Sequence, residues 1–337
     1  MKQQVQKHKL ARDKKVSNQP ALKVEDLRTY FFTREGVVRA VDGINFEIYP
    51  NEAFGLVGES GCGKSMTALS ILRLVPPPGK IMGGKVYLRD HNLMASDYDE
   101  ICSLRGNRIS IVFQDPMTYL NPVFRIGDQI AEGLLIHQNI SREEAWKRSV
   151  ELMESVRIVD AADRAKDYPF QFSGGMRQRV MIAMAIANDP ELIILDEPTT
   201  ALDVTIQAQI MDLVRDIQGE HGMGVLLITH DLGVVADLCQ RVAVMYAGKI
   251  VELAKIEPLF ETPRHPYTIG LFNSLPRLDQ RRSRLTTIEG QPPNLARLPK
   301  GCSFAIRCSV ARPDCISTPQ ELREVDPGHW VRCWLVE

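Results

Sequence analysis

Runs of apolar residues divide the first part of the chain into expected strands and one helix. Residues 37–41 and 44–48 are rich in β-branched and aromatic side chains, which predicts two strands. The run at residues 53–57 is short and almost wholly apolar, which is typical of a buried parallel strand. A helix is expected from Gly63 to Leu74, because the three prolines 76–78 would end it.

The middle of the chain has helical spacing. Residues 124–188 carry many charges and few β-branched runs, and Ser141 with Glu144 forms a capping-box pattern at one helix start. Strand patterns return at residues 192–195 and 225–229, with a helix expected at 204–220 between them. Strand, helix and strand in this order predict an α/β fold with a parallel sheet.

Composition and charge narrow the class of protein. The chain has 337 residues, a formal net charge of −1, 44% hydrophobic and 25% charged residues, which is ordinary for a globular protein. The near-zero charge argues against a general nucleic-acid binder. No stretch approaches the ~18 apolar residues of a membrane span, and the polar start lacks the pattern of a signal peptide. We therefore expect a cytoplasmic protein whose membrane role comes through partners.

The two ends of the chain differ from its middle. The first 15 residues are rich in Lys and Arg, which predicts a disordered basic tail over residues 1–20, or weak attraction to anionic lipid headgroups. From about Pro258 the chain becomes rich in Pro, Arg and Cys. The pattern predicts a main domain at 21–257 and a separate small extension at 258–337.

A phosphate-binding loop follows the strand expected at 53–57. The segment fits the pattern G-x-x-x-x-G-K-[ST] between a strand and a helix, and the nucleotide-binding residues expected there are Gly58, Glu59, Ser60, Gly61, Cys62, Gly63, Lys64, Ser65 and Met66. Glycines let backbone N–H groups surround phosphate oxygens. The lysine reaches the β- and γ-phosphates, and the serine hydroxyl binds Mg²⁺.

Two carboxylates end the apolar strand expected at 192–195. Asp196 is predicted to be the second Mg²⁺ ligand, and Glu197 is predicted to be the general base for the attacking water. Consecutive side chains of a strand point to opposite sides, so we expect the two carboxylates to serve different roles.

A further motif indicates a family. The segment Phe172–Arg179, with sequence FSGGMRQR, resembles the signature of ABC ATPases, and the order of phosphate loop, Gln114, signature, Asp196-Glu197 and His230 is similar to that family over residues 22–255. The resemblance implies a P-loop NTPase (RecA-like) ABC cassette with an antiparallel β subdomain and a helical subdomain at about 116–176.

The resemblance also implies roles for single residues. Gln114 matches the glutamine that touches Mg²⁺ and the lytic water, and His230 matches the switch histidine that contacts the γ-phosphate. Asp203 matches the loop that communicates across a dimer. Phe31 aligns with the aromatic that stacks on adenine, with Tyr30 as the alternative.

The signature offers its own phosphate contacts. A serine hydroxyl and bare N–H groups at a helix start can bind a γ-phosphate, and Ser173, Gly174 and Gly175 provide them. In the family this surface faces the phosphate loop of the opposite subunit. We therefore expect ATP to be sandwiched in a head-to-tail pair of ATPase subunits.

Two departures from the commonest signature indicate a branch. Phe172 and Met176 stand where Leu and Gln are usual, and this form resembles importers of dipeptides and oligopeptides, and in some members nickel. Residues 265–268, 274–276, 289–293 and 301–308 resemble the C-terminal extension of such ATPases. The resemblance implies a peripheral subunit on the cytoplasmic face of the inner membrane, with two permease subunits, a paralogous ATPase and, indirectly, a solute-binding protein as partners.

Seven cysteines fall into two groups. Cys62, Cys102 and Cys239 are scattered and are expected to be buried or nearly so. Cys302, Cys308, Cys315 and Cys333 cluster, with gaps of 5, 6 and 17 residues that do not match common zinc sites. They suit a [4Fe–4S] cluster, as occurs in this branch; zinc and free thiols are the alternatives, and His329 is expected to be structural.

Two other classes of protein compete with a transport ATPase. A soluble ABC protein acting on ribosomes or DNA would usually carry two cassettes or a coiled-coil insertion, and neither pattern is present. A regulatory subunit that binds ATP without hydrolysis is disfavoured because Glu197 and His230 keep competent side chains.

Overall fold

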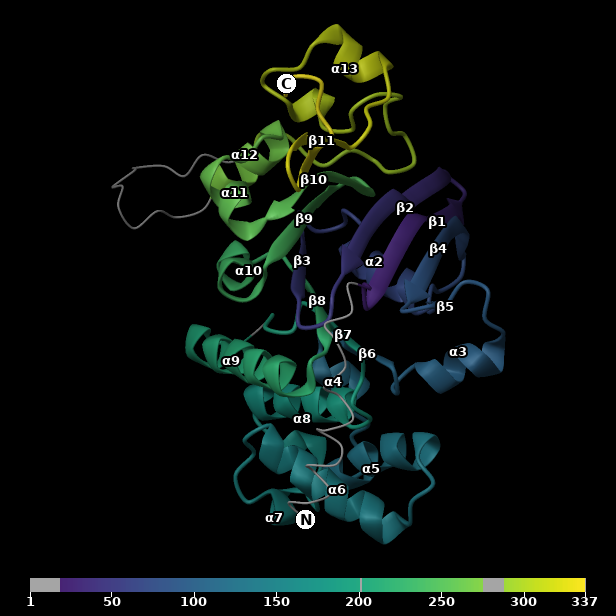
Figure 1. Ribbon diagram of the computed structural model, residues 1–337, viewed down its shortest axis with the longest axis vertical. Coiled ribbons are helices and arrows are strands. Elements are labelled where there is room, and N and C mark those ends of the chain that lie inside the picture. The colour runs from purple at the N-terminus through teal and green to yellow at the C-terminus, as the bar shows by residue number, and fades with distance from the viewer. Residues whose placement is uncertain (1–18, 201, 275–287, 337) are drawn as a thin grey trace.

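The computed structural model describes residues 19–200, 202–274 and 288–336. Two sheets lie at its centre (Figure 1). The larger has eight strands among the described residues, in the order β11-β12-β10-β9-β3-β8-β7-β6. Their bounds in that order are Arg323–Asp326, His329–Val331, Lys249–Lys255, Arg241–Tyr246, Ala53–Val57, Gly224–Thr229, Leu192–Asp196 and Ile109–Val112.

The core of the larger sheet is parallel. β3 pairs in parallel with β8 and β9, and β7 pairs in parallel with β6 and β8. Every residue of β3, β7 and β8 is buried, as their apolar sequences predict. The expected α/β fold is therefore confirmed, and the parallel strands end together at the edge where the predicted site residues follow.

The smaller sheet is antiparallel and stands beside the larger one. Its order is β2-β1-β4-β5, with bounds Gly36–Ile48, Leu22–Thr33, Gly79–Leu88 and His91–Asn92. The prediction of two strands at 37–41 and 44–48 was wrong in one respect, because β2 is a single strand of 13 residues. Irregularities in its pairing with β1 let the strand continue through Gly43.

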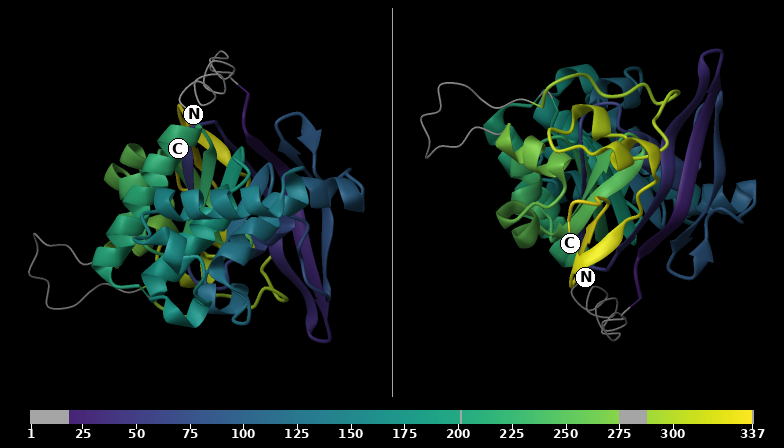
Figure 2. Two further views of the ribbon diagram at one scale, coloured as in Figure 1. Left: turned by 90° about the horizontal axis from the view of Figure 1, so that it is seen from below. Right: turned by 90° about the horizontal axis from the view of Figure 1, so that it is seen from above.

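The two faces of the larger sheet are covered differently. Ala53 and Val57 of β3 pack in a core with α9 and α10, whereas Phe54 and Leu56 pack with the antiparallel sheet and α2. Figure 2 shows the antiparallel strands on one side and the green helices on the other. The helices of these layers are α2 (Lys64–Ile71), α3 (Tyr98–Leu104), α9 (Val204–His221) and α10 (Leu232–Leu238).

The expected helical segment forms the end of the molecule that is lowest in Figure 1. Ser141 accepts a hydrogen bond from the Glu144 N–H and caps α6, as predicted. The last helix, α8, runs on past residue 176 and packs against β6. The elements are α4 (Pro116–Tyr119), α5 (Ile126–His137), α6 (Arg142–Ser155), α7 (Ala161–Arg164), the 3-10 turn η1 (Pro169–Gln171) and α8 (Gly174–Ile186).

The C-terminal extension is continuous with the main domain. β12 pairs with β10, and β11 pairs with β12, so the extension adds two strands to the larger sheet. The expectation of a separate unit beginning at 258 is corrected by this pairing. The other elements here are α11 (Ile256–Glu261), α12 (Pro266–Asn273), the 3-10 turn η2 (Ala305–Arg307) and α13 (Pro313–Ser317).

The predicted basic tail lies almost wholly outside the described residues, as does most of the 274–276 motif. Within the described part of the chain, every helix is too short or too polar to cross a bilayer.

Candidate functional site

The phosphate loop joins the buried strand β3 to α2, and two of its glycines are required by close backbone approaches. Gly58 has φ of 152° and Gly63 has φ of 110°. A Cβ would lie 2.2 Å from the Met245 carbonyl oxygen at Gly58 and 2.1 Å from the Ala40 carbonyl oxygen at Gly63. Gly63 also starts α2 without a side-chain cap, so the first N–H groups of the helix stay open for an anion.

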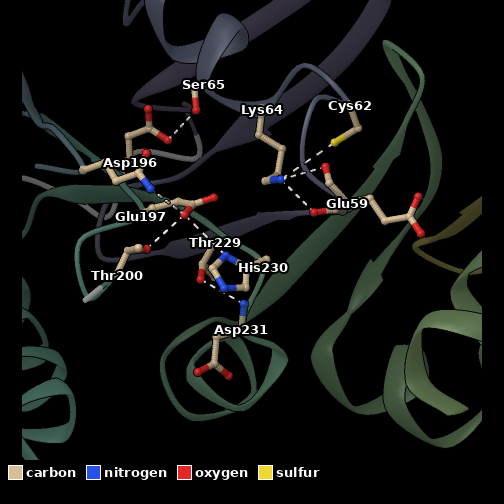
Figure 3. Close-up of polar contacts among 12 residues, drawn as sticks. Glu59, Cys62, Lys64, Ser65, Asp196, Glu197, Thr200, Thr229, His230 and Asp231 are labelled. Atoms are coloured by element: carbon tan, nitrogen blue, oxygen red, sulfur yellow. Dashed lines mark hydrogen bonds and ion pairs between the residues drawn. The ribbon is translucent and has the colours of Figure 1, made fainter. Parts of the chain in front are cut away.

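Lys64 is buried and curls back over its own loop. Its Nζ donates to the carbonyl oxygens of Gly58 at 2.7 Å and Glu59 at 3.1 Å (Figure 3). Cys62 is buried beneath it, and burial raises the pKa of its thiol. The ammonium group is therefore already at the loop, where phosphate oxygens can replace these carbonyls as acceptors.

The side chain of Glu59 has a partner outside the phosphate loop, and the nucleotide-binding role of this residue stays a prediction. Its carboxylate points away from Lys64 and Asp196 (Figure 3) and accepts hydrogen bonds from Arg307 of the extension. Ser60, Gly61 and Ser65 are the exposed positions of the loop, and Met66 packs against the core below it.

Asp196 and Ser65 form the expected pair of oxygen ligands. Asp196 ends β7 and Ser65 lies in the first turn of α2, and the serine hydroxyl donates to the Asp196 Oδ1 at 2.9 Å. Burial raises the pKa of Asp196 to about 6, although the Ser65 hydrogen bond opposes the shift. A buried carboxylate and a hydroxyl fit the hard oxygen donors that Mg²⁺ requires.

Glu197 lies at a point where three loops converge. Its Oε2 accepts a hydrogen bond from the Gln114 Nε2 at 3.2 Å and lies 3.3 Å from the His230 Nδ1. The Thr200 hydroxyl donates to the same oxygen at 2.9 Å. The fold thus brings together Gln114, Glu197 and His230, which are far apart in sequence. It adds Thr200, which was not predicted from the sequence. The only local signal for Thr200 is its position three residues after Glu197.

The reason Asp196 and Glu197 face different partners differs from the one expected. Strand alternation does not separate them, because Glu197 lies beyond the end of β7 with φ of 48°. A left-handed conformation at a non-glycine residue costs about 1–3 kcal/mol, so the contacts around Glu197 must offset this cost. This turn points the second carboxylate toward Gln114 and His230, and leaves the first facing Ser65.

The signature and Asp203 each begin a helix. The Ser173 hydroxyl accepts the Met176 N–H at 3.3 Å and caps α8, whose first residues are Gly174 and Gly175. The Asp203 carboxylate accepts the Ile206 N–H at 3.0 Å and caps α9. In the described residues, no hydrogen bond joins the signature to residues 58–65. Phe172 is buried in the core, which accounts for a large apolar residue at that position.

The two candidate aromatics for adenine stacking differ in their surroundings. The Tyr30 hydroxyl donates to the Asp42 Oδ1 at 2.6 Å, and the Arg39 guanidinium lies 5.8 Å from its ring centre. Among the described residues, Phe31 has no hydrogen-bonding or cationic partner of this kind, and it is only partly buried. These contacts engage Tyr30 and favour Phe31, whose stacking role stays a prediction.

The four C-terminal cysteines all lie in the extension, and each is a free thiol. Burial raises the pKa of Cys302 to about 11, and the other three thiols add to the shift. Within the residues that the structure describes, however, no three His, Cys, Asp or Glu side chains are placed to share a metal ion. The described geometry gives no support to the predicted cluster. Of the scattered cysteines, Cys62 and Cys239 are buried and Cys102 is partly buried, as expected.

Exposed apolar side chains lie beside Gln114, around α4. Met117, Tyr119, Val123 and Phe124 are each between 49% and 71% exposed. Phe113 and Tyr119 stack with ring centres 3.9 Å apart. Exposed large apolar residues this close together in the sequence favour contact with another protein.

Comparisons with known proteins agree with this geometry. Residues 41–200 match the family "ABC transporter", and residues 251–315 match "Oligopeptide/dipeptide transporter, C-terminal region". The chain is 53% identical to "Probable peptide ABC transporter ATP-binding protein y4tR" of Sinorhizobium fredii, with 93% of this chain and 94% of that protein covered. It is 48% identical to "Oligopeptide transport ATP-binding protein AppD" of Bacillus subtilis, with 94% and 97% covered.

Solved structures show the same fold. A dimeric ATP-binding cassette, MJ0796, bound to ADP and Pi, superposes with a TM-score of 0.63 at 30% identity, covering 70% of this chain and 98% of that one. The cbiO1 subunit of a Clostridium perfringens ABC transporter gives 0.62 at 26% identity, covering 73% and 93%. The chain is an ABC transporter ATPase and belongs to the ATP-binding proteins of the oligopeptide/dipeptide transporter family.

Proposed function

We propose that this chain hydrolyses ATP to drive the import of dipeptides or oligopeptides. The observation that carries the ATPase assignment is the convergence of Gln114, Glu197 and His230 beside the phosphate loop and Asp196. The extension and the names of the relatives support peptides as the cargo.

In this proposal the loop binds the triphosphate through the open N–H groups at the start of α2 and through Lys64. Ser65, Asp196 and Gln114 would hold Mg²⁺, which neutralises charge on the phosphate oxygens when bound. Glu197 accepts a proton from the water whose oxygen attacks the γ-phosphorus, while the bond to the β–γ bridging oxygen breaks. Gln114 and His230 orient Glu197, because both contact its Oε2.

A second ATPase subunit is needed to complete the site. ABC cassettes work as dimers, and the MJ0796 relative is a dimer. The Ser173–Gly175 helix start is capped and ready to bind an anion, but it makes no hydrogen bond to the phosphate loop of its own chain in the described residues. We infer that it serves the nucleotide of a partner, a paralogue in this branch, and that Asp203 lies at the same interface.

Permease subunits are the second kind of partner. The exposed apolar residues around α4 adjoin Gln114, so a subunit docked there would sense the state of the nucleotide site. The chain would then sit at the cytoplasmic face of the inner membrane. A solute-binding protein would deliver peptide to the permeases from the other side.

Replacing Glu197 with Gln tests the assignment of the general base. The amide keeps the size and the hydrogen-bonding atoms but cannot accept the proton, so we expect hydrolysis to fall at least about 100-fold, the usual contribution of general-base catalysis. ATP affinity is expected to stay near that of the native chain. Phosphate release and equilibrium nucleotide binding measure the two properties.

The matched control is Glu191→Gln, since Glu191 is a carboxylate outside the site that pairs with Arg89 and Arg108. This variant should hydrolyse ATP normally. Full turnover by Glu197→Gln would contradict the assignment of the base.

The iron–sulfur cluster stays a prediction about the four C-terminal cysteines. Iron and sulfide analysis of protein purified without oxygen measures it. Protein free of both would leave zinc or free thiols as the alternatives.

A further inference from the structure

The C-terminal extension reaches the phosphate loop at Glu59. The guanidinium of Arg307 donates to both carboxylate oxygens of Glu59, at 2.7 Å and 3.1 Å. The Arg307 side chain is 4% exposed and that of Glu59 is 25% exposed. A two-point contact of this kind is among the strongest charge-assisted pairs and also fixes orientation.

Arg307 is itself held in place by the extension and by β9. Its Nε donates to the carbonyl oxygen of Glu289 at 3.0 Å, and its other nitrogens reach the Ile288 carbonyl and the Tyr246 hydroxyl. Its guanidinium lies 5.9 Å from the ring centres of both Tyr246 and Phe304. The arginine is therefore a fixed cation, and Glu59 is the carboxylate that balances it.

A second contact from the extension holds the backbone of the same residue. The Glu59 N–H donates to the hydroxyl of Tyr267, in α12, at 2.9 Å. Tyr267 is fully buried and packs against Tyr246 and Phe304, with ring centres 4.6 Å and 5.4 Å away. With Lys64 on the carbonyl oxygen, every polar group of Glu59 has a partner.

The rest of the loop has fewer constraints. Near the two ends of the loop, Gly58 and Gly63 lie so close to backbone carbonyls that a Cβ would clash. A Cβ at Gly61 would meet nothing within 4 Å. Glycine-rich segments lose much conformational entropy when they become ordered. A loop that is already held in its binding shape loses less on binding, and so binds more tightly.

We propose that Arg307 and Tyr267 are positioning residues for the phosphate loop: by holding Glu59, the C-terminal extension sets the affinity of this subunit for ATP. The proposal rests on the proposed function of the loop as the ATP site. It gives the extension a role in the ATPase reaction as well as in the fold. Because coupling between sites is reciprocal, bound nucleotide should in turn stabilise the extension around Arg307.

Two variants of the full chain test the proposal. Arg307→Gln removes the charge and the two-point contact, and Tyr267→Phe removes only the hydroxyl. We expect Arg307→Gln to weaken ATP binding by about 5- to 30-fold, within the usual range of coupling between sites. Tyr267→Phe should weaken it by about 2- to 5-fold, since one neutral hydrogen bond is lost. The KM for ATP of the assembled transporter should rise with little change in kcat, because the reacting groups are untouched.

A double-mutant cycle separates positioning from general damage. Glu59→Gln and Arg307→Gln should each weaken ATP binding. The double variant should bind ATP no more weakly than whichever single variant has the lower affinity, because both changes break the same contact. The control is Arg264→Gln, because Arg264 lies in the same extension and pairs with the exposed Asp326 instead of the loop. It should keep native affinity.

Native ATP affinity in both Arg307→Gln and Tyr267→Phe would overturn the proposal, as would additive effects in the cycle. If Arg307→Gln fails to fold, the ATP affinities of Tyr267→Phe and Arg307→Lys test the proposal in its place, and native affinity in both would overturn it. Hydrogen exchange at residues 301–308 with and without ATP gives an independent measure, and the proposal requires slower exchange with ATP. Failure of the native chain to bind ATP would overturn the proposed function instead, so the two failures are distinguishable.

Discussion

Asp196 is 7% exposed, and burial raises the pKa of its carboxylate to about 6. Glu197, next in sequence, leaves the strand in a left-handed conformation and contacts Gln114 and His230. At the scale of the residue, the site therefore keeps a desolvated charge and a strained backbone side by side. Both cost stability in the nucleotide-free chain, which is common at functional sites.

Replacing Asp196 with Asn should make the nucleotide-free protein more stable at neutral pH. The folded-state pKa lies above the usual 3.8, so the ionised form is destabilised in the folded chain, and this loss grows as pH rises from about 4 to 6. A neutral amide of the same size avoids it and still accepts from Ser65. We expect a gain of about 1–3 kcal/mol, measured by urea unfolding at pH 7.5.

The same variant should lose the rise in melting temperature that Mg²⁺ and ATP give together, since it lacks the carboxylate ligand. Glu197→Gln serves as the comparison and should keep that rise. If Asp196→Asn is no more stable than the native chain, this would contradict the claim that the buried Asp196 charge destabilises the nucleotide-free protein.

At the scale of the element, several helices that border the site begin with a polar side chain. Asp231 caps α10 by accepting N–H groups of Gly233 and Val234, and Asp203 caps α9. In the extension, His265 caps α12 by accepting the Tyr267 N–H at its Nδ1, at 3.1 Å. The cap of α12 thus fixes the first turn of the helix that presents the Tyr267 hydroxyl to the phosphate loop.

Replacing His265 with Asn should make the protein less sensitive to acid. Burial, with Arg332 nearby, lowers the pKa of His265 to about 3, whereas the unfolded chain binds a proton near pH 6.5. Stability is therefore lost as pH falls below 6.5, by about 2 kcal/mol between pH 7 and pH 5. Asn is a good N-cap and does not titrate. Between pH 7 and pH 5, the free energy of unfolding of the variant should therefore fall by about 2 kcal/mol less than that of the native chain.

Urea unfolding of both proteins at pH 7 and pH 5 gives this difference. An unchanged pH slope in the variant would contradict the lowered pKa of His265, because it would show that the folded and unfolded chains take up protons equally at this position.

At the scale of the whole molecule, the extension and the cassette share a sheet and a buried polar centre. Glu252 of β10 is fully buried and accepts the N–H groups of Arg264 and His265, each at 2.8 Å. His329 of β12 contacts the same carboxylate at 2.7 Å. The Glu252 side chain of the cassette therefore joins two segments of the extension. We expect the cassette and the extension to unfold together in one cooperative transition.

Replacing Glu252 with Gln should destabilise the protein by about 3 kcal/mol, because an amide N–H₂ would face donors in a buried centre. The change should be seen in the fluorescence of Trp330 and Trp334, which lie in the extension. Glu257→Gln, at an exposed position in α11, is the control and should shift stability by less than about 0.5 kcal/mol. Equal stability of the two variants would contradict the anchoring role.

The local patterns in the sequence determined the elements and much of the chemistry. The apolar runs at β3, β7 and β8 predicted buried parallel strands, because strands covered on both faces have few polar positions. The spacing of Gly58, Gly63 and Lys64 predicted a phosphate loop, since its backbone geometry depends on residues next to one another. Such features are local, so sequence alone suffices for them.

Only the tertiary structure decided which residues far apart in the sequence contact each other. Glu59 belongs to the loop motif, yet its partners are Arg307 and Tyr267, more than 200 residues away. The extension looked separate because its composition changes, but β12 pairs with β10. Hydrogen bonds and ion pairs of this kind depend on how the sheet brings distant segments together, and no local pattern records that.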